Sequence, residues 1–175
     1  MRYTIVPTPW GSFGFVSRDG RLLATYLPRG RPELIAAIGG AWPLARLDDG
    51  AMPTFRRKLL SYFAGRAVAF TEPIDLTGMP TFYTRVLAAC RTIPYGKTAS
   101  YQDLARATGN PAACRAVGGA MASNPLPLVI PCHRVLRSDG SMGGFSSPRG
   151  IDLKKRMLRL EGALAAEPHG RRIAV

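Results

Sequence analysis

The sequence predicts an α+β fold, in which a small α/β part is followed by a helical part that ends in a wing. Three observations predict it. A hairpin turn signal lies near the N-terminus, segments with helical periodicity and capping residues follow from about residue 80, and a second turn signal comes after those helices. Such a change from strand signals to helix signals along one chain is typical of α+β folds.

The first expected element is a β-hairpin. Two apolar runs, Phe13–Val16 and Leu22–Leu27, flank the dipeptide Asp19-Gly20. Asp-Gly favours two-residue hairpin turns, because both central residues of such a turn need a positive φ. The pattern therefore predicts two antiparallel strands joined at this dipeptide.

Helices are expected in the rest of the N-terminal part, residues 1–78. One should begin at Pro32, since proline is favoured at the first helical position, and a second should run from about Phe55 to Ala64, before Gly65. Residues 71–80 contain prolines and a glycine and should connect the two parts. Because residues 1–78 show no pattern of chemically active side chains, we expect them to buttress the second part.

The second part, residues 79–165, should begin with a helix that ends near Ile93-Pro94. Its apolar positions form one stripe at helical spacing, which consists of Phe82, Val86, Leu87 and Ala89. Apolar residues at this spacing face the core along one side of a helix.

Two shorter helices should follow and form a helix-turn-helix. Ser100 is a favourable N-cap, Asp103 stands in the acidic position three residues later, and Gly109 should close this helix. Asn110 should then cap the next helix, with Pro111 at its first position. Two short helices joined by a tight turn are typical of this motif, whose second helix is the recognition helix.

The expected recognition helix has a smooth face. Its small residues are Ala112, Ala113, Ala116, Gly118, Gly119, Ala120 and Ala122. Arg115 stands alone among them, and each glycine weakens the helix by roughly 1 kcal/mol relative to alanine. Two explanations stay open at this point: close approach to a nucleic acid without a sequence code, or tight helix packing in the core.

The last expected elements are a hairpin wing and a helix. Asp139-Gly140 indicates a turn within residues 136–145, and the apolar positions from Leu153 to Leu160 predict a basic amphipathic helix that ends at Gly162. We expect residues 166–175 to form a mobile tail.

Composition restricts the compartment and the cofactors. No apolar run approaches the ~18 residues of a membrane span and the N-terminus lacks the pattern of a signal peptide, so we expect a soluble, cytoplasmic protein with no membrane partner. The 3 cysteines are widely spaced and odd in number, which argues against a disulfide framework. Since 2 histidines leave too few ligands for structural zinc, we expect no metal and no cofactor.

The positive charge lies mostly in the second half of the chain. Of the net +13, residues 80–175 carry +9, from 14 basic and 5 acidic side chains. A cationic surface of this kind fits a nucleic-acid partner, although an arginine-rich genome would produce the same excess.

Cys132 is the strongest candidate for a chemical role. It lies between Pro131 and His133, and Arg134 follows. Proline fixes its own φ and pushes the preceding residue towards an extended conformation, and an imidazole neighbour favours the reactive thiolate. A cysteine considered alone is more often a small buried core residue. The residues around Cys132 favour the nucleophile.

These residues resemble a known family. The run Pro131-Cys132-His133-Arg134-Val135 is similar to the active-site motif of the O6-alkylguanine-DNA alkyltransferases. Further motifs of that family occur in the same order: Thr92-Ile93-Pro94-Tyr95-Gly96-Lys97-Thr98, Ser100-Tyr101-Gln102-Asp103-Leu104-Ala105, Gly109-Asn110-Pro111, and Arg115-Ala116-Val117-Gly118-Gly119-Ala120-Met121 before Asn124-Pro125. The resemblance is strong from about Phe82 to Gly162 and weak before that.

The resemblance implies a fold and an activity. The fold would be a ribonuclease H-like N-terminal domain followed by a winged helix-turn-helix domain that binds DNA and performs catalysis. The activity would be stoichiometric transfer of the alkyl group from O6-alkylguanine, and from O4-alkylthymine, in double-stranded DNA to the protein's own cysteine. The protein would act as a monomer in the cytoplasm, associated with the nucleoid if bacterial.

The resemblance also implies the roles of individual residues. The expected catalytic residues are Cys132 as nucleophile and alkyl acceptor, His133 and Glu161 as its relay through a water, and Tyr101 as proton donor. The expected DNA-binding residues are Arg115 as the finger that fills the gap left by an extruded base, with Tyr101, Ala116, Gly118, Gly119 and Arg134. Substrate pocket and structural support are expected from Asn124, Pro131, Val135, Ser146 and Lys154, with Ser147 as the alternative to Ser146. Cys114, beside Arg115, is an additional thiol on the expected DNA face.

Three other classes of protein fit parts of the sequence. A non-catalytic lesion-binding protein of the alkyltransferase-like type would share the architecture, but such proteins typically replace the nucleophilic cysteine. A winged-helix transcription regulator would need more base-reading side chains on its recognition helix. A cysteine hydrolase usually brings its cysteine and histidine together from distant positions, whereas Cys132 and His133 are adjacent.

Overall fold

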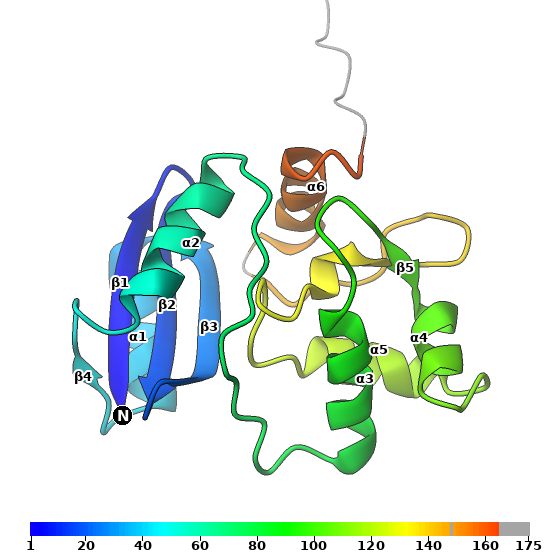
Figure 1. Cartoon of the computed structure of the whole chain (residues 1–175), viewed down its shortest axis with the longest axis horizontal. Helices are drawn as coiled ribbons and strands as arrows, with labels where there is room; N and C mark the ends of the chain where they lie inside the picture. Colours follow the sequence, from blue (N-terminus) through cyan, green and yellow to red (C-terminus); the bar gives the residue numbers. More distant parts are fainter. Residues whose placement is uncertain (148, 165–175) are drawn as a thin grey trace, which may run out of the picture.

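The computed structural model describes residues 1–147 and 149–164 of the chain (Figure 1). The N-terminal part consists of β1 (Arg2–Thr8), β2 (Gly11–Arg18), β3 (Arg21–Arg29), α1 (Arg31–Ala41), β4 (Arg46–Leu47) and α2 (Pro53–Phe63). The second part consists of α3 (Thr81–Arg91), β5 (Ala99–Ser100), α4 (Tyr101–Ala107), α5 (Cys114–Ala122), the 3₁₀ turn η1 (Cys132–Arg134), β6 (Val135–Leu136) and α6 (Gly150–Leu160). The expected tail, residues 166–175, lies outside the described residues.

The N-terminal sheet has the strand order β3-β2-β1-β4. The predicted hairpin between β2 and β3 is confirmed, and its turn residues Asp19 and Gly20 have φ of 50° and 74°. The sequence pattern did not predict β1, which pairs with β2 in antiparallel register along its whole length, or β4, which adds two residues in parallel to β1.

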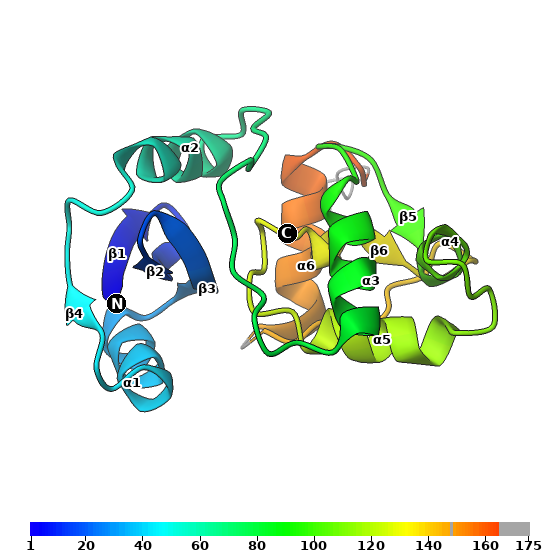
Figure 2. The same cartoon turned by 60° about the horizontal axis from the view of Figure 1, so that its bottom comes forward.

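The two predicted N-terminal helices are confirmed and cover opposite faces of the sheet (Figure 2). The side chains of β2 alternate between the two faces of the sheet. Phe13 and Phe15 pack with α2, while Val16 belongs to the buried cluster on the α1 side. Gly14 also faces α1, where an added Cβ would lie 2.8 Å from a methyl of Leu34. The sheet is therefore buried on both faces.

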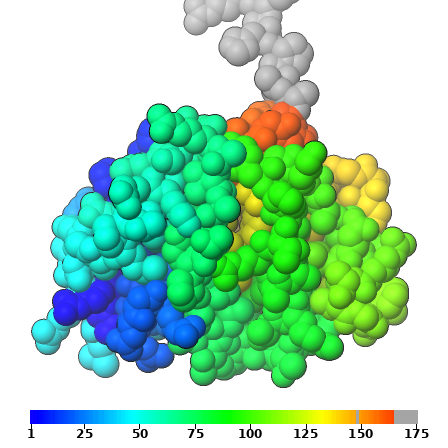
Figure 3. Space-filling model, in the orientation of Figure 1, coloured from blue at the N-terminus to red at the C-terminus, as the bar shows by residue number. Residues whose placement is uncertain are grey.

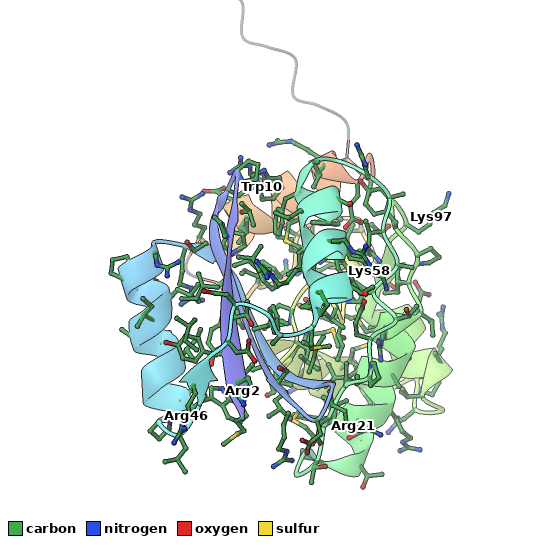
Figure 4. All side chains as sticks on the ribbon, turned by 60° about the vertical axis from the view of Figure 1, so that its left-hand side comes forward. Arg2, Trp10, Arg21, Arg46, Lys58 and Lys97 are labelled. Carbon is green, nitrogen blue, oxygen red and sulfur yellow. The ribbon has the colours of Figure 1, made fainter. Side chains whose placement is uncertain are left out.

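One hydrophobic core joins the two parts of the chain. A single buried cluster contains side chains from β2, α2, α3, α5 and α6. Figure 4 shows Trp10 at the turn between β1 and β2. The guanidinium of Arg156 on α6 lies 4.0 Å from the centre of the Trp10 ring. The space-filling view shows that the surfaces of both parts are continuous (Figure 3).

Strand β3 holds the segment that leads to Cys132. The backbone amide of Thr25 donates a 2.9 Å hydrogen bond to the carbonyl of Pro125, and its hydroxyl donates a 2.7 Å hydrogen bond to the carbonyl of Pro127. Because Thr25 is buried, these bonds fix the segment firmly against the sheet.

The predicted start of α4 is confirmed, whereas the predicted start of α5 is wrong. Ser100 and Asp103 form a complete capping box, and Gly109 follows the helix with φ 78°. Helix α5 begins at Cys114 instead of Pro111. Residues 110–113 form a separate turn, in which the Ala113 amide donates a 3.0 Å hydrogen bond to the Asn110 carbonyl, and the Pro111 carbonyl accepts a hydrogen bond from the Gln102 side-chain amide.

The hairpin wing expected within residues 136–145 is wrong as a pair of strands. The turn itself is present, since the Arg137 amide donates to the Ser141 carbonyl at 3.0 Å and the Gly140 amide donates to the Arg137 carbonyl. However, β6 pairs in parallel with β5, and residues 141–147 contain no strand. The later helix is confirmed as α6, with Gly162 at φ 70° after its end. None of the helices in the described part of the chain has the length and apolar character needed to cross a bilayer.

The contact between β3 and the Cys132 segment leads to a stability prediction. Thr25→Val keeps the side-chain shape but leaves the partly buried Pro127 carbonyl without its hydroxyl donor, so the free energy of unfolding should fall by about 1–2 kcal/mol. Urea unfolding at neutral pH measures this loss. Thr84→Val, which removes a 3.3 Å bond within the exposed start of α3, should lower stability much less. Equal losses in the two variants would contradict a special role for Thr25.

Candidate active site

A tight turn presents the Cys132 thiol. Pro131 has φ −81° and ψ 62°, and the Cys132 amide donates a 2.8 Å hydrogen bond to the Ile130 carbonyl, which is the geometry of an inverse γ-turn. The Arg134 amide then donates to the Pro131 carbonyl at 2.8 Å and closes η1. Cys132 is buried, with 9% of its surface exposed, so its thiol has one fixed environment.

Asn124 ties the end of α5 to this turn. Its amide group donates a 2.9 Å hydrogen bond to the Ile130 carbonyl, and its side-chain oxygen accepts a 3.0 Å bond from the Leu126 amide. These are the hydrogen bonds expected of Asn124. Between them, Leu128 adopts φ 80°, a left-handed conformation that costs a non-glycine residue about 1–3 kcal/mol. The surrounding contacts must therefore hold the segment in place.

A buried carboxylate organises the residues behind Cys132. Oε1 of Glu161 lies 2.8 Å from His133 Nε2 and accepts a 2.8 Å hydrogen bond from the Tyr62 hydroxyl. Oε2 accepts hydrogen bonds from Arg134 Nε at 2.8 Å and from the Gly96 amide at 3.2 Å. We call Tyr62, Gly96, His133, Arg134 and Glu161 the Glu161 cluster. It joins η1 and α6 to α2 in the N-terminal part.

The cluster fixes the charge states of its members. Burial acts to raise the pKa of Glu161, but the hydrogen bonds from His133 and Arg134 outweigh it and hold this pKa at about 2. Burial lowers the pKa of His133, against the opposing effect of Glu161. The imidazole is therefore neutral at physiological pH. Its Nδ1 is buried and has no hydrogen-bond partner within the described part of the chain.

The structure corrects the assignment of Arg134 to the DNA surface. Arg134 is buried, two of its nitrogens bond Glu161, and Nη1 donates to the Ile93 carbonyl at 2.6 Å. A guanidinium engaged in this way cannot reach a phosphate. Its positive charge instead compensates a buried carboxylate, which would otherwise be costly.

The thiol of Cys132 is not acidified at rest. Burial raises its pKa, and a hydrogen bond from Asn124 and the charge of Lys154 oppose this only in part. Lys154 is fully buried and donates a 2.6 Å hydrogen bond to the Val135 carbonyl. Both groups support the backbone next to the thiol, and the nucleophile must be activated by a neighbouring base.

A cavity of about 610 Å³ opens onto Cys132. This volume lies within the usual range of small-ligand pockets. Its lining includes the predicted site residues Tyr101, Arg115, Gly118, Cys132 and Ser146. The sequence did not predict its other lining residues, which are Gln102, Cys114, Met121, Ala122, Arg137, Ser138, Gly143, Gly144 and Phe145. These residues belong to no motif of reactive side chains, so the sequence alone does not show that they surround a cavity.

Tyr101 packs tightly against the loop after β6. An added Cβ at Gly143 would collide with the Tyr101 hydroxyl, so the absence of a side chain at Gly143 makes room for the phenol. Burial raises the pKa of Tyr101, which keeps the hydroxyl protonated and able to donate a hydrogen bond.

Some of the small residues of α5 lie at the protein surface, and others allow close packing against α3. Arg115 and Ala116 are exposed, and an added Cβ at Gly118 would meet nothing within 4 Å. At Gly119 the same Cβ would lie 2.7 Å from the Tyr83 hydroxyl on α3. The assignment of Gly119 to the DNA surface is therefore corrected to helix packing, whereas Gly118 faces open space.

The structure separates the two serines of the loop before α6. Ser146 lines the Cys132 cavity, and Ser147 directs its hydroxyl to the Gly150 carbonyl at 3.4 Å. Pro131 is buried and lies on the opposite side of the Cys132 segment, where it lines a second cavity of about 660 Å³.

Comparisons with known proteins agree with this site. A model of the 6-O-methylguanine DNA methyltransferase DNA-binding domain matches residues 81–163. A methylated-DNA–protein-cysteine methyltransferase of Metallosphaera sedula is 33% identical over 169 residues, which are 96% of this chain and 97% of the relative. One of Mycobacterium tuberculosis is 42% identical over 118 residues, which are 67% of this chain and 70% of the relative.

Solved structures extend the likeness to the fold. The structure of Mycobacterium tuberculosis OGT in complex with DNA has a TM-score of 0.79 and 32% identity, and covers 93% of this chain and 94% of that one. The O6-methylguanine-DNA methyltransferase of Pyrococcus kodakaraensis has a TM-score of 0.64 and 28% identity, and covers 91% of this chain and 99% of that one. The mixed α and β fold thus matches proteins that transfer methyl groups to a cysteine. The chain belongs to the methylated-DNA–protein-cysteine methyltransferase family.

The low pKa of Glu161 predicts acid sensitivity. Because its folded pKa is about 2, against an ordinary 4.5, the carboxylate stabilises the fold fully above pH 4.5, and this contribution is lost as the pH falls towards 2. It amounts to roughly 3 kcal/mol at ~1.36 kcal/mol per pKa unit. Tyr62→Phe removes one donor, so the acid transition should begin at a higher pH. Denaturant unfolding between pH 7 and pH 2.5 measures it.

Tyr26→Phe is the matched control for Tyr62→Phe. The Tyr26 hydroxyl accepts a 3.0 Å hydrogen bond from the Trp42 indole in the N-terminal part, and no hydrogen bond joins it to a carboxylate of the described residues. The acid midpoint of this variant should equal that of the parent protein. If Tyr62→Phe also left the midpoint unchanged, the Tyr62 bond would not contribute to the low pKa of Glu161.

Proposed function

We propose that this protein repairs O6-alkylguanine in double-stranded DNA by transferring the alkyl group to Sγ of Cys132. The observation that most strongly supports this proposal is that Cys132, Tyr101 and Arg115 line one cavity. This cavity lies between α4, α5 and the loop after β6. Family membership supplies the reaction class, and the position of Cys132 supplies the acceptor.

The transfer needs one base and one acid. Sγ attacks the alkyl carbon, the bond from that carbon to O6 breaks, and a thioether remains on Cys132. The thiol proton passes through a water to Nδ1 of His133, which is neutral and has no protein partner within the described residues. Glu161 stays anionic, orients the imidazole and stabilises the imidazolium. Tyr101 donates its proton to the guanine as the bond to O6 breaks, and solvent returns the proton from the imidazolium of His133 to the phenolate.

Position contributes more to the rate than thiol acidity does. A pKa lowered by several units would increase the thiolate fraction, but the intrinsic nucleophilicity of the thiolate would fall by a similar factor. In-line placement of the reacting atoms can supply about 7–11 kcal/mol. The turn at Pro131 and the bonds of Asn124 supply this rigidity. Because the thioether has no release route, each molecule reacts once.

The target base must leave the stack to reach the cavity, at a cost of a few kcal/mol. We propose that Arg115 fills the space left in the duplex, while Tyr101 presses on the neighbouring phosphate. The exposed Ala116 and the open surface at Gly118 allow α5 to approach the DNA closely. Recognition of this kind carries little sequence information, which suits a repair protein.

We also propose the domain organisation on which this function rests. Residues 1–78 form a ribonuclease H-like buttress, and residues 79–165 form a winged helix-turn-helix domain with α5 as its recognition helix. The turn at residues 137–141 serves as the wing without a strand pair. The protein acts as a cytoplasmic monomer. A cavity that contains an intact thiol favours repair over the non-catalytic, lesion-binding alternative.

Cys132 should be the sole alkyl acceptor. Incubation with duplex DNA that contains O6-methylguanine should add one methyl group to the intact mass, located in the peptide that contains Cys132. Cys90 is buried with a strongly raised pKa, and Cys114 has no neighbouring base in the described structure. Cys132→Ala should bind DNA without gaining mass. A methyl group on Cys114 would refute the mechanism.

Arg115→Ala should separate base extrusion from chemistry. Repair in duplex DNA should slow by at least tenfold, because the extruded state loses the side chain that fills the gap, whereas the reaction with free O6-benzylguanine requires no extrusion and should change little. Single-turnover rates with both substrates measure this difference. Equal slowing with both substrates would mean that Arg115 shapes the pocket.

A further inference from the structure

Gln102 joins α4 to the start of α5. Its side-chain amide donates a 2.8 Å hydrogen bond to the Pro111 carbonyl, and its side-chain oxygen lies 3.0 Å from Sγ of Cys114. Since a thiol can donate and an amide oxygen accepts, the second contact is a hydrogen bond from Cys114 to Gln102. One side chain therefore holds both ends of the short segment that precedes α5.

Within the described residues, the other side-chain contact at the start of α5 is a longer one, 3.9 Å from Sγ of Cys114 to the Pro111 carbonyl. The N-cap residue of α5 is Ala113, which makes no side-chain capping bond, and the first turn of this helix contains no acidic residue. Helix α4, in contrast, begins with the capping box of Ser100 and Asp103. The well-anchored helix thus positions the poorly anchored one through the Gln102–Cys114 bond.

This bond lies between the two side chains that act on the DNA. Gln102 follows Tyr101 in α4, and Cys114 precedes Arg115 in α5. All four residues line the cavity that contains Cys132. A change at the Gln102–Cys114 bond would therefore alter the distance between the phenol that presses on the backbone and the guanidinium that enters the stack.

We propose that Cys114 is a positioning residue for base extrusion, which acts through Gln102 to place Arg115 relative to Tyr101. The proposal rests on the function proposed above and assigns a role to the second thiol of the cavity. Cys114 contributes a hydrogen-bond donor and takes no alkyl group.

Two substitutions at residue 114 test the proposal. Cys114→Ala removes the donor, while Cys114→Ser keeps a hydroxyl that can donate to Gln102. In Cys114→Ala, the ratio of the duplex rate to the free O6-benzylguanine rate should fall about fivefold, which is the effect of losing one net hydrogen bond. Cys114→Ser should restore most of this ratio. A ratio that is unchanged in Cys114→Ala, or that Cys114→Ser fails to restore, would overturn the proposal.

A double-mutant cycle locates the effect. If Cys114 acts through Arg115, adding Cys114→Ala to Arg115→Ala should not lower the duplex rate further. A further fivefold loss would mean that Cys114 acts independently of Arg115, and would also overturn the proposal.

Amide hydrogen exchange tests the positioning without any substrate. The amide of Val117 bonds the Ala113 carbonyl at 2.9 Å, in the first turn of α5. Its exchange should be several-fold faster in Cys114→Ala than in the parent protein or in Cys114→Ser. If the parent protein transferred no alkyl group at all, the proposed function would fail, while exchange at Val117 would still decide whether Cys114 fixes α5.

Discussion

The structure of the site depends on the buried carboxylate of Glu161. It accepts hydrogen bonds from Tyr62, Gly96 and Arg134 and lies within hydrogen-bond distance of His133 Nε2. A buried carboxylate is costly unless it is paired and fully hydrogen-bonded, and here the partners come from α2, from the loop after α3 and from η1. The carboxylate therefore does more than orient the histidine. It determines how α2, the loop after α3, η1 and α6 meet, and a loss of Glu161 would leave Arg134 buried without its counter-charge.

The N-terminal part supports the residues around Cys132, although none of the candidate reactive groups lies in it. The Tyr62 hydroxyl of α2 donates a hydrogen bond to the Glu161 carboxylate. Thr25 of β3 donates hydrogen bonds to the carbonyls of Pro125 and Pro127, which precede the Cys132 turn. The Thr25 bonds act on the segment between α5 and η1, in which Leu128 occupies an unfavourable backbone conformation, and Tyr62 acts on η1 through Glu161. Such strain persists only where surrounding contacts over-determine the backbone. The N-terminal sheet therefore helps to hold the Cys132 thiol in position.

The sequence predicted those parts of the fold that depend on interactions between residues close together in the chain, such as turns and helix caps. The turn at Asp19-Gly20, the capping box at Ser100 and the end of α6 at Gly162 each follow from a few neighbouring residues. The family motifs predicted part of the cavity lining through resemblance, including Tyr101, Arg115 and Cys132. The burial of Arg134 and the bond of Tyr62 to Glu161 could not be predicted, because each depends on a partner 27 or 99 residues away. The predicted start of α5 was wrong because Asn110 and Pro111 form a separate turn before the helix, and the Pro111 carbonyl is bonded by Gln102 of α4.

The chemical state of Cys132 follows from the same rigidity. A thiol with a raised pKa is mostly protonated at neutral pH, and protonated thiols react poorly with soluble electrophiles. A protein that reacts once gains from this, because stray alkylation would consume it. In the proposed mechanism, activation is coupled to the substrate: an extruded base in the cavity brings the alkyl carbon into line with Sγ, and the thiol proton passes through a water to the neutral His133. The selectivity of the thiol thus comes from its position, which the contacts around Glu161 and Asn124 maintain.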